Sequence, residues 1–218
     1  MRADVIFDLD GTLIESEQIW RDVRHEFVMA NGGQWRPDAA AEMIGMRTSE
    51  WARYLHDDLG VAVAPEQIAE RVVTAVAQRL AKPPVLPGAD AALHRLARDF
   101  RLGLASSAAL RVAQTVLAAT GWDALFAVVV SADEVARGKP APDVYLRALE
   151  LLGADSSRTA AVEDSANGIR SAHGARIAVV AIPNRDFPPD VAALALATRL
   201  LPNLDALDSA VICETVRK

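Results

Sequence analysis

Short apolar runs alternate with helical patterns through the second half of the chain, and each run stops at polar residues or a turn signal. The clearest runs cover residues 102–105, 126–130, 159–162 and 177–182, followed by a short predicted strand at 199–201 and a helix at 204–211. Bounded apolar runs are typical of buried strands, and strands alternating with helices form parallel sheets. The sequence therefore predicts an α/β fold, with helices on both faces of a parallel sheet.

A stretch without a strand pattern separates the first apolar run, residues 3–7, from this alternation. It holds helical patterns at residues 15–30, 38–44, 48–59 and 65–80. Three prolines within residues 82–88 then predict a stiff, extended linker. We therefore expect an inserted all-α domain, residues 15–84 with its linker, in an α/β core made of residues 1–14 and 85–218.

Charge and composition exclude several classes of protein. The 218 residues carry a net charge of -6 without any lysine and arginine cluster, so we expect no nucleic-acid partner. No apolar stretch reaches the ~18 residues of a membrane span, and no charged-then-apolar leader precedes the first predicted strand. We therefore expect a cytoplasmic protein without a membrane partner. The single cysteine, Cys213, excludes an intrachain disulfide and a cysteine-rich metal site.

Polar residues collect where three predicted strands end, and a lysine lies on a loop that enters a predicted helix. These residues are Asp8, Asp10, Ser106, Ser107, Glu163, Asp164 and Lys139. Because the carboxyl ends of parallel strands share one edge of the sheet, where ligands bind in such folds, we expect these side chains in a single crevice. Carboxylate oxygens suit Mg²⁺, serine and lysine donate to phosphate, and of two neighbouring aspartates one can be nucleophile and the other acid/base.

Each of these residues alone also has a purely structural interpretation. Asp10 can belong to a solvated Asp-Gly turn, and Ser106 can cap the following helix. Lys139 can lie in solvent, and the acids at residues 163–164 are favoured at a helix N-terminus. Four such coincidences, all at predicted strand-end loops, are less consistent with the sequence than one shared site.

Four motifs carry a resemblance to a known family. They are DLDGTL at residues 8–13, the serine at 106, GKPAPD at 138–143 and EDSANGI at 163–169. On these motifs the chain resembles the haloacid dehalogenase superfamily, in the branch that contains sugar-phosphate phosphatases and β-phosphoglucomutases. The resemblance covers essentially the whole chain. It implies a Rossmann-like core, a helical cap inserted after the first strand, and Mg²⁺ as cofactor.

The resemblance implies a role for the charged residues at the strand ends. Asp8 resembles the nucleophile that becomes an aspartyl phosphate, and Asp10 resembles the general acid/base. Asp8, Asp164 and the main-chain carbonyl of Asp10 resemble the Mg²⁺ ligands, with Glu163 as a supporting or occasional ligand. Lys139 is similar to the lysine that clamps the phosphate and holds the nucleophile ionised.

Substrate contacts are implied less directly. Ser106 resembles the second part of the phosphate clamp. Ser107 stands where the family often has asparagine, so contacts near the leaving group are expected to differ. The cap segment 44–48 is similar to the family's specificity loop, in which Gly45 permits close approach and Arg47 can meet a sugar hydroxyl or a phosphate. A helix-helix turn with a solvated arginine is the alternative interpretation of this segment.

The sequence thus leads us to expect a Mg²⁺-dependent phosphatase for small phosphorylated metabolites, above all sugar or polyol phosphates. A β-phosphoglucomutase-type phosphotransferase is the first alternative, but Gln18-Ile19-Trp20 stands where those mutases usually carry a histidine. A catalytically inactive protein that binds phosphometabolites is the second, and the intact motif residues disfavour it. We expect a monomer or a weak homodimer.

Overall fold

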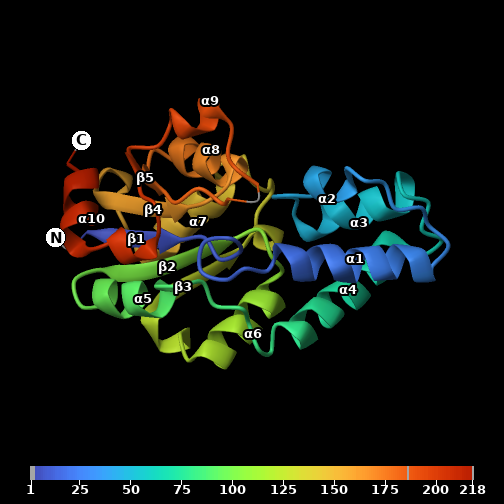
Figure 1. Ribbon diagram of the computed structural model, residues 1–218. Helices are drawn as coiled ribbons and strands as arrows, with labels where there is room; N and C mark the ends of the chain where they lie inside the picture. The colour runs from blue at the N-terminus through green and yellow to red at the C-terminus, as the bar shows by residue number, and fades with distance from the viewer. Residues whose placement is uncertain (1–2, 186, 218) are drawn as a thin grey trace.

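A parallel sheet forms the centre of the computed structural model, which describes residues 3–185 and 187–217 (Figure 1). Within these residues its strand order is β3-β2-β1-β4-β5-β6, and every neighbouring pair is parallel. The strands are β1 (Asp4–Phe7), β2 (Arg101–Ser106), β3 (Phe126–Ser131), β4 (Thr159–Glu163), β5 (Ala178–Ala181) and β6 (Arg199–Leu200). The chain places β2 and β3 on one side of β1 and β4 on the other, so the strand order reverses between β1 and β4. In such sheets ligands bind beyond the carboxyl ends of the two strands at this point.

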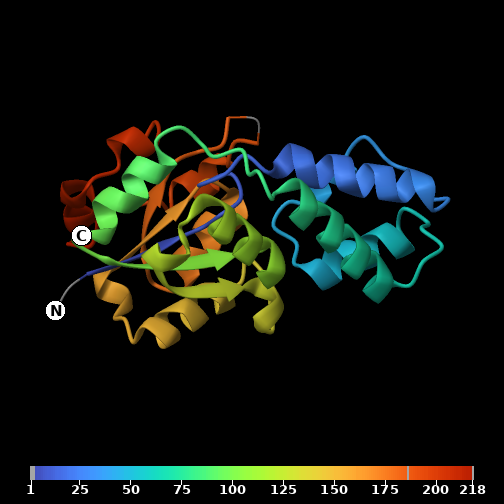
Figure 2. The ribbon, with the colours of Figure 1, turned by 90° about the horizontal axis from the view of Figure 1, so that it is seen from below.

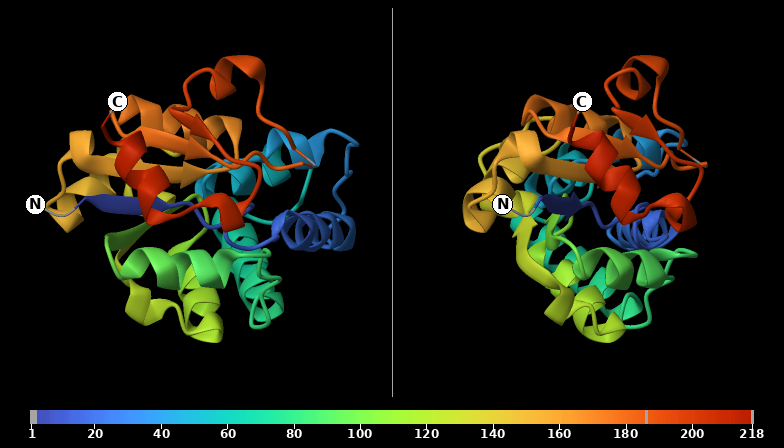
Figure 3. Two further views of the ribbon diagram at one scale, coloured as in Figure 1. Left: turned by 60° about the vertical axis from the view of Figure 1, so that its left-hand side comes forward. Right: turned by 90° about the vertical axis from the view of Figure 1, so that its left-hand side faces the viewer.

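Helices cover both faces of this sheet, as the sequence predicts. Alternate residues of β1 face two separate hydrophobic clusters: Val5 and Phe7 point to one, and Ile6 points to the other. The first cluster holds α5 (Ala89–Ala97), α6 (Leu110–Thr120) and α10 (Ser209–Thr215), and the second holds α7 (Asp143–Leu152) and α8 (Ala166–Gly174). Figure 3 shows the sheet between these two layers. Nowhere in the described residues is a helix both long and apolar enough to cross a bilayer.

Four helices without any intervening strand lie beyond the edge of the sheet where β1 ends (Figures 1 and 2). They are α1 (Glu17–Ala30), α2 (Ala39–Glu42), α3 (Thr48–Asp57) and α4 (Pro65–Arg79). The chain enters and leaves them side by side, because Ile14 and Val85 form a β-bridge and the Glu15 N–H donates to the Pro84 carbonyl at 2.8 Å. The α/β fold with an inserted helical cap is thus confirmed, while the domain boundaries proposed from the sequence stay a prediction.

Asp4 interrupts the first apolar run without breaking the strand. Its carboxylate is buried and accepts from Arg101 Nε at 2.7 Å and Nη2 at 2.9 Å. Asp4 and Arg101 are register partners on β1 and β2, so the pair joins the two strands at their amino ends. This aspartate therefore lies at the edge of the sheet opposite to Asp8 and takes no part in the site.

The C-terminal region differs from the sequence prediction. A single helix over residues 204–211 is wrong, because a 3₁₀ turn (Leu204–Ala206) is followed by a separate helix, α10. The Asp208 carboxylate accepts from the Val211 N–H at 2.9 Å and caps α10. Asp208 is therefore the N-cap of α10 and not a residue within a longer helix. The sequence analysis also missed four short helices: α9 (Val191–Leu194) and the 3₁₀ turns Asp123–Leu125, Ala132–Glu134 and Ser156–Arg158.

Candidate active site

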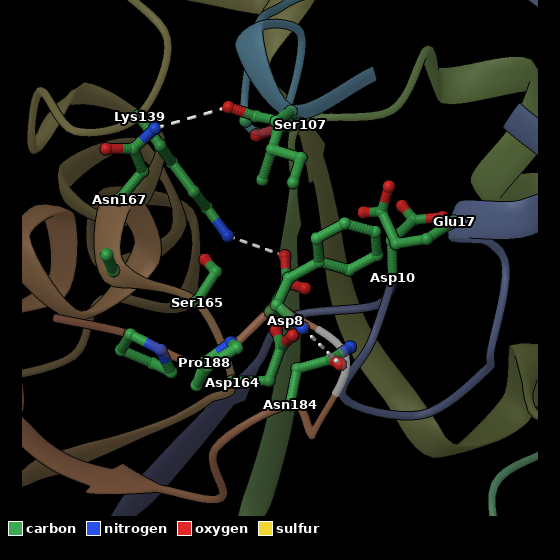
Figure 4. A pocket seen from close by; sticks show the side chains of 16 residues that line it. Asp8, Asp10, Glu17, Ser107, Lys139, Asp164, Ser165, Asn167, Asn184 and Pro188 are labelled. Atoms are coloured by element: carbon green, nitrogen blue, oxygen red, sulfur yellow. Dashed lines mark hydrogen bonds and ion pairs between the residues drawn. The ribbon is translucent and has the colours of Figure 1, made fainter. Parts of the chain in front are cut away.

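The ends of β1 and β4 bring a buried group of charged residues together. Asp8 follows β1 directly, and Glu163 ends β4, the neighbouring parallel strand. Lys139 reaches them from the loop before α7, and its Nζ lies 2.5 Å from Asp8 Oδ1 and 2.6 Å from Glu163 Oε1. All three side chains are buried, and Figure 4 shows Lys139 extended toward Asp8. The sequence prediction that these residues meet at the strand ends therefore agrees with their positions.

Asp8, Glu163 and Asp164 form an oxygen-rich group that fits a divalent cation. One carboxylate oxygen from each lies within 4.8 Å of the others, and all three residues are buried. These three carboxyl groups face the single positive charge of Lys139, so in their ionised forms they carry an excess of negative charge. Hard oxygen ligands with such an excess match the preference of Mg²⁺. Thr12 Oγ1 donates to Asp164 Oδ1 at 3.1 Å and fixes the orientation of that carboxylate.

Glu163 is held by more donors than either aspartate. Its Oε1 accepts from Lys139 and from the Tyr145 hydroxyl at 2.8 Å. Its Oε2 accepts from the Asp164 N–H at 3.2 Å and from the Ser165 hydroxyl at 3.3 Å. Because these bonds use most of its acceptor capacity, Glu163 is better placed to orient Lys139 than to contact a cation itself.

Burial dominates the protonation of this group. It raises the pKa of Asp8 to about 8, with the charges of Glu163 and Asp10 adding to the effect and Lys139 opposing it. Burial, followed by the charges of Glu163 and Asp8, raises the pKa of Asp164 well above its ordinary value. Burial acts to lower the pKa of Lys139, but the negative charges of Asp8 and Glu163 outweigh the effect of burial, so the pKa is raised. A bound divalent cation would therefore favour the ionised form of both aspartates.

Asp10 points toward the cap instead of into the metal-binding group. Its Oδ1 accepts from Trp20 Nε1 at 3.2 Å and from the Ser16 hydroxyl, and its Oδ2 accepts from Ser106 Oγ at 3.3 Å. Ser16 occupies the N-cap position of α1, but its side chain makes no capping bond there and bonds Asp10 instead. Serine hydroxyls donate or accept, so Ser16 and Ser106 can hold both the ionised and the protonated form of Asp10.

Two glycines allow the backbone to approach the site closely. Gly11 has a φ of 82°, and a Cβ on it would lie 2.2 Å from Asp164 Oδ2. Gly45 has a φ of 79°, and a Cβ there would lie 2.9 Å from Asn167 Nδ2. Asn167 in turn donates to the Ile44 carbonyl at 3.3 Å, so the predicted specificity loop touches the core at this point. Both turns need a residue without a side chain.

A cavity of about 440 Å³ opens above these residues, and Figure 4 shows its lining. Six residues singled out from the sequence line it: Asp8, Asp10, Gly45, Ser107, Lys139 and Asp164. The Ser107 hydroxyl is buried and has no hydrogen-bond partner within the described residues, which leaves it ready to bind a ligand. The volume is in the range of small-molecule sites.

Three predicted site residues do not line this cavity. Ser106 and Glu163 lie behind it, against Asp10 and Lys139. Arg47 lies at the junction of cap and core, where its Nη1 donates to the Val135 carbonyl at 3.1 Å and its Nε pairs with Glu50 at 3.3 Å. The predicted contact of Arg47 with substrate stays a prediction.

Other lining residues were not singled out from the sequence. They are Glu17, Ala41, Ile44, Ser165, Ala166, Asn167, Asn184, Phe187, Pro188 and Pro189. Asn167 lies within the EDSANGI motif, and Glu17 follows the DLDGTL motif by four residues, so their place in or after a motif was the available signal. Nothing in the sequence marks Asn184, Phe187, Pro188 and Pro189, because they lie after β5 outside any helix or strand.

Curated relatives resemble the chain over most of its length. Protein CbbY from Rhodobacter capsulatus is 33% identical over 92% of this chain and 97% of its own. Hexitol phosphatase B from Escherichia coli is 32% identical over 82% of each protein. The chain spans only about half (48%) of a bifunctional riboflavin kinase/FMN phosphatase from Arabidopsis thaliana, to which it is 28% identical over 83% of its own length.

A solved structure extends this similarity to three dimensions. CbbY from Rhodobacter sphaeroides, in complex with phosphate, has a TM-score of 0.88 and 27% identity over 98% of this chain and 100% of that one. A variant of the same protein, bound to xylulose-(1,5)bisphosphate, has a TM-score of 0.83 over 95% and 100% of the two chains. A family model described as haloacid dehalogenase-like hydrolase matches residues 5–182, which include every strand-end residue described above. The chain therefore belongs to the haloacid dehalogenase-like hydrolases.

Proposed function

We propose that this protein is a Mg²⁺-dependent phosphatase that hydrolyses sugar or polyol phosphates through an aspartyl phosphate on Asp8. Membership in a hydrolase family with phosphatases among its relatives makes it a phosphoric monoester hydrolase. The observation that carries the mechanism is the buried group of Asp8, Lys139, Glu163 and Asp164 beside a cavity whose other wall carries Asp10. A hexitol phosphatase and a protein solved with xylulose-(1,5)bisphosphate among the relatives support a sugar or polyol phosphate as substrate.

In this mechanism two aspartates divide the work. A carboxylate oxygen of Asp8 attacks phosphorus, and the bond from phosphorus to the leaving oxygen breaks as Asp10 gives that oxygen a proton. Asp10 then takes a proton from water, whose oxygen attacks the aspartyl phosphate and releases inorganic phosphate with Asp8 restored. Lys139, at 2.5 Å from Asp8, reduces the repulsion between two anionic reactants.

Mg²⁺ fits the oxygen ligands offered by Asp8 and Asp164, with the main-chain carbonyl of Asp10 proposed as a third. When bound, it supplies positive charge that offsets the charge of the transferred phosphoryl group. Glu163 and Thr12 support this arrangement through their bonds to Lys139 and Asp164.

Phosphate release from para-nitrophenyl phosphate, with Mg²⁺ and with excess EDTA, tests the activity. We expect turnover that requires Mg²⁺, followed by higher kcat/KM for monophosphates of sugars or polyols than for nucleotides in a substrate panel. No release by a folded protein at high enzyme concentration would favour the inactive binding protein instead. Conversion of β-glucose 1-phosphate to glucose 6-phosphate without net phosphate release would favour the mutase.

Added Mg²⁺ is expected to stabilise the protein more at pH 8 than at pH 5. The raised pKa values of Asp8, about 8, and Asp164 mean that protons compete with the ion at the lower pH. At about 100 times its dissociation constant the ion should raise the Tm at pH 8 by roughly 5–10 °C. Differential scanning fluorimetry with and without Mg²⁺ measures this shift. Asp164→Asn should abolish it, and an equal shift in that variant would place the ion elsewhere.

A further inference from the structure

A buried arginine in the cap has no role in the mechanism above. Arg24 lies on α1, is only 7% exposed, and its Nε has no hydrogen-bond partner within residues 3–185 and 187–217. The guanidinium carbon lies 4.6 Å from the ring centre of Trp20 and 4.9 Å from that of Trp51. Two aromatic faces stabilise the cation, but they do not satisfy its N–H donors. An incompletely paired buried charge therefore lies in the cap.

Arg24 borders a small recess that continues from the main cavity. The recess has a volume of about 40 Å³, and its walls include Arg24, Trp20 and Trp51. Five residues line both the recess and the main cavity, among them Asp10 and Glu17, so the two spaces meet beside these carboxyl groups. Figure 4 shows Asp10 and Glu17 close together, on the opposite side of the cavity from Lys139. In the proposed reaction Asp10 faces the leaving oxygen, so the remainder of the substrate extends toward this recess.

The charges around the recess favour an uncharged ligand group. Burial lowers the pKa of Arg24 to about 10, with Glu17 and Asp10 opposing the decrease, so the guanidinium is charged at neutral pH. Burial, followed by the charge of Asp10, raises the pKa of Glu17 to about 7, so Glu17 is partly ionised at neutral pH. A second phosphate group would therefore find the Arg24 cation already shared with two carboxyl groups. A hydroxyl group can donate to a carboxylate and accept from a guanidinium at the same time.

We propose that Glu17 and Arg24 form a specificity subsite for the hydroxyl groups of an uncharged, polyhydroxylated substrate tail, and that this subsite disfavours substrates with a second phosphate. Substrate hydroxyls donate to the Glu17 carboxylate and accept from the Arg24 guanidinium, while Trp20 and Trp51 fix the guanidinium plane. This inference rests on the proposed phosphatase function. It adds two residues on α1 to the specificity loop expected from the sequence at 44–48.

The test compares kcat/KM for three substrates of different tails. Sorbitol 6-phosphate has a neutral hydroxylated tail, fructose 1,6-bisphosphate carries a second phosphate, and para-nitrophenyl phosphate has no hydroxyl group. For the unaltered protein we expect kcat/KM to be about tenfold higher for sorbitol 6-phosphate than for the bisphosphate. Arg24→Gln and Glu17→Gln should each lose about tenfold more on sorbitol 6-phosphate than on the aryl phosphate, mainly through KM.

Two further variants control for folding and for surface charge. Arg24→Lys keeps the charge but not the planar fork, so it should fold like the unaltered protein and still lose selectivity. Arg53→Gln removes an exposed arginine from α3. It should leave kcat/KM for sorbitol 6-phosphate unchanged relative to the bisphosphate and relative to the aryl phosphate. Two results would overturn the subsite alone. One is an equal loss of kcat/KM on sorbitol 6-phosphate and on the aryl phosphate in the Arg24 and Glu17 variants. The other is a preference of the unaltered protein for the bisphosphate. Absence of aryl-phosphate hydrolysis by the unaltered protein would overturn the phosphatase and the subsite together.

Discussion

Asp8→Asn is expected to lower kcat for aryl-phosphate hydrolysis by about 10⁴-fold or more. Asparagine has nearly the same shape as aspartate, but its amide oxygen is a poor nucleophile and carries no charge for a cation. Asp8 is buried and lies 2.5 Å from Lys139, so no water-exposed carboxylate can move into its position without rearranging the site. Initial rates of phosphate release, with Tm measured beside them, separate lost chemistry from lost folding.

A matched control removes an aspartate that the mechanism does not use. Asp22 on α1 is 44% exposed and accepts from Gln18, so Asp22→Asn should keep normal rates. The two substitutions are chemically identical and differ only in position. If Asp8→Asn keeps more than about 1% of the normal kcat, Asp8 is not the nucleophile, since loss of an attacking group is normally far larger.

The positions of the strand-end residues follow from the sequence because of the parallel sheet. Asp8 and Glu163 each stand at the end of an apolar run, and neighbouring parallel strands bring such ends together. Helix boundaries were harder to predict, since they depend on local capping. Asp208 sits in a sequence compatible with helix continuation, and only its bond to the Val211 N–H shows that it begins α10.

The hydrogen bonds of the site could not be predicted from residue spacing. Tyr145 belongs to the apolar stripe of α7 by its spacing, and it is indeed fully buried. Its hydroxyl nevertheless donates to Glu163, because the stripe faces the end of β4. Trp20 similarly combines a buried ring with an N–H bond to Asp10. A helical pattern predicts which face is buried, but not what the polar tip of an aromatic residue meets there.

The cap residues show the same limit for substrate selection. Arg47 stands in the loop that resembles the family's specificity segment, yet its guanidinium bonds the Val135 carbonyl. Arg24 carries no motif signal and lies against the recess. The direction of a long side chain depends on tertiary packing, which a single sequence does not encode in its local pattern. Spacing along the chain could therefore identify the chemistry at the strand ends better than the residues that choose the substrate.

Lys139→Met is expected to lower kcat by about 10²- to 10³-fold and to destabilise the fold in a pH-dependent way. The unaltered protein balances the Asp8 and Glu163 carboxylates with one buried ammonium, at 2.5 and 2.6 Å. Methionine keeps the length of the side chain but removes that charge. Loss of one partner from a buried charged group costs about 3 kcal/mol in the free energy of unfolding.

The sign of the pH dependence follows from Asp8. Its pKa in the folded protein, about 8, is above its ordinary value of 3.8, so its contribution to stability is complete below pH 4 and is lost as pH rises through 8. Lys139 opposes the rise in this pKa, so its removal enlarges the loss. Urea unfolding should therefore show a small difference in the free energy of unfolding between the unaltered protein and Lys139→Met at pH 4. This difference should be largest at pH 8 and above. Lys82→Met, at an exposed position, is the control. A deficit for Lys139→Met that is the same at both pH values would mean that packing, not charge, is what Lys139 contributes to stability.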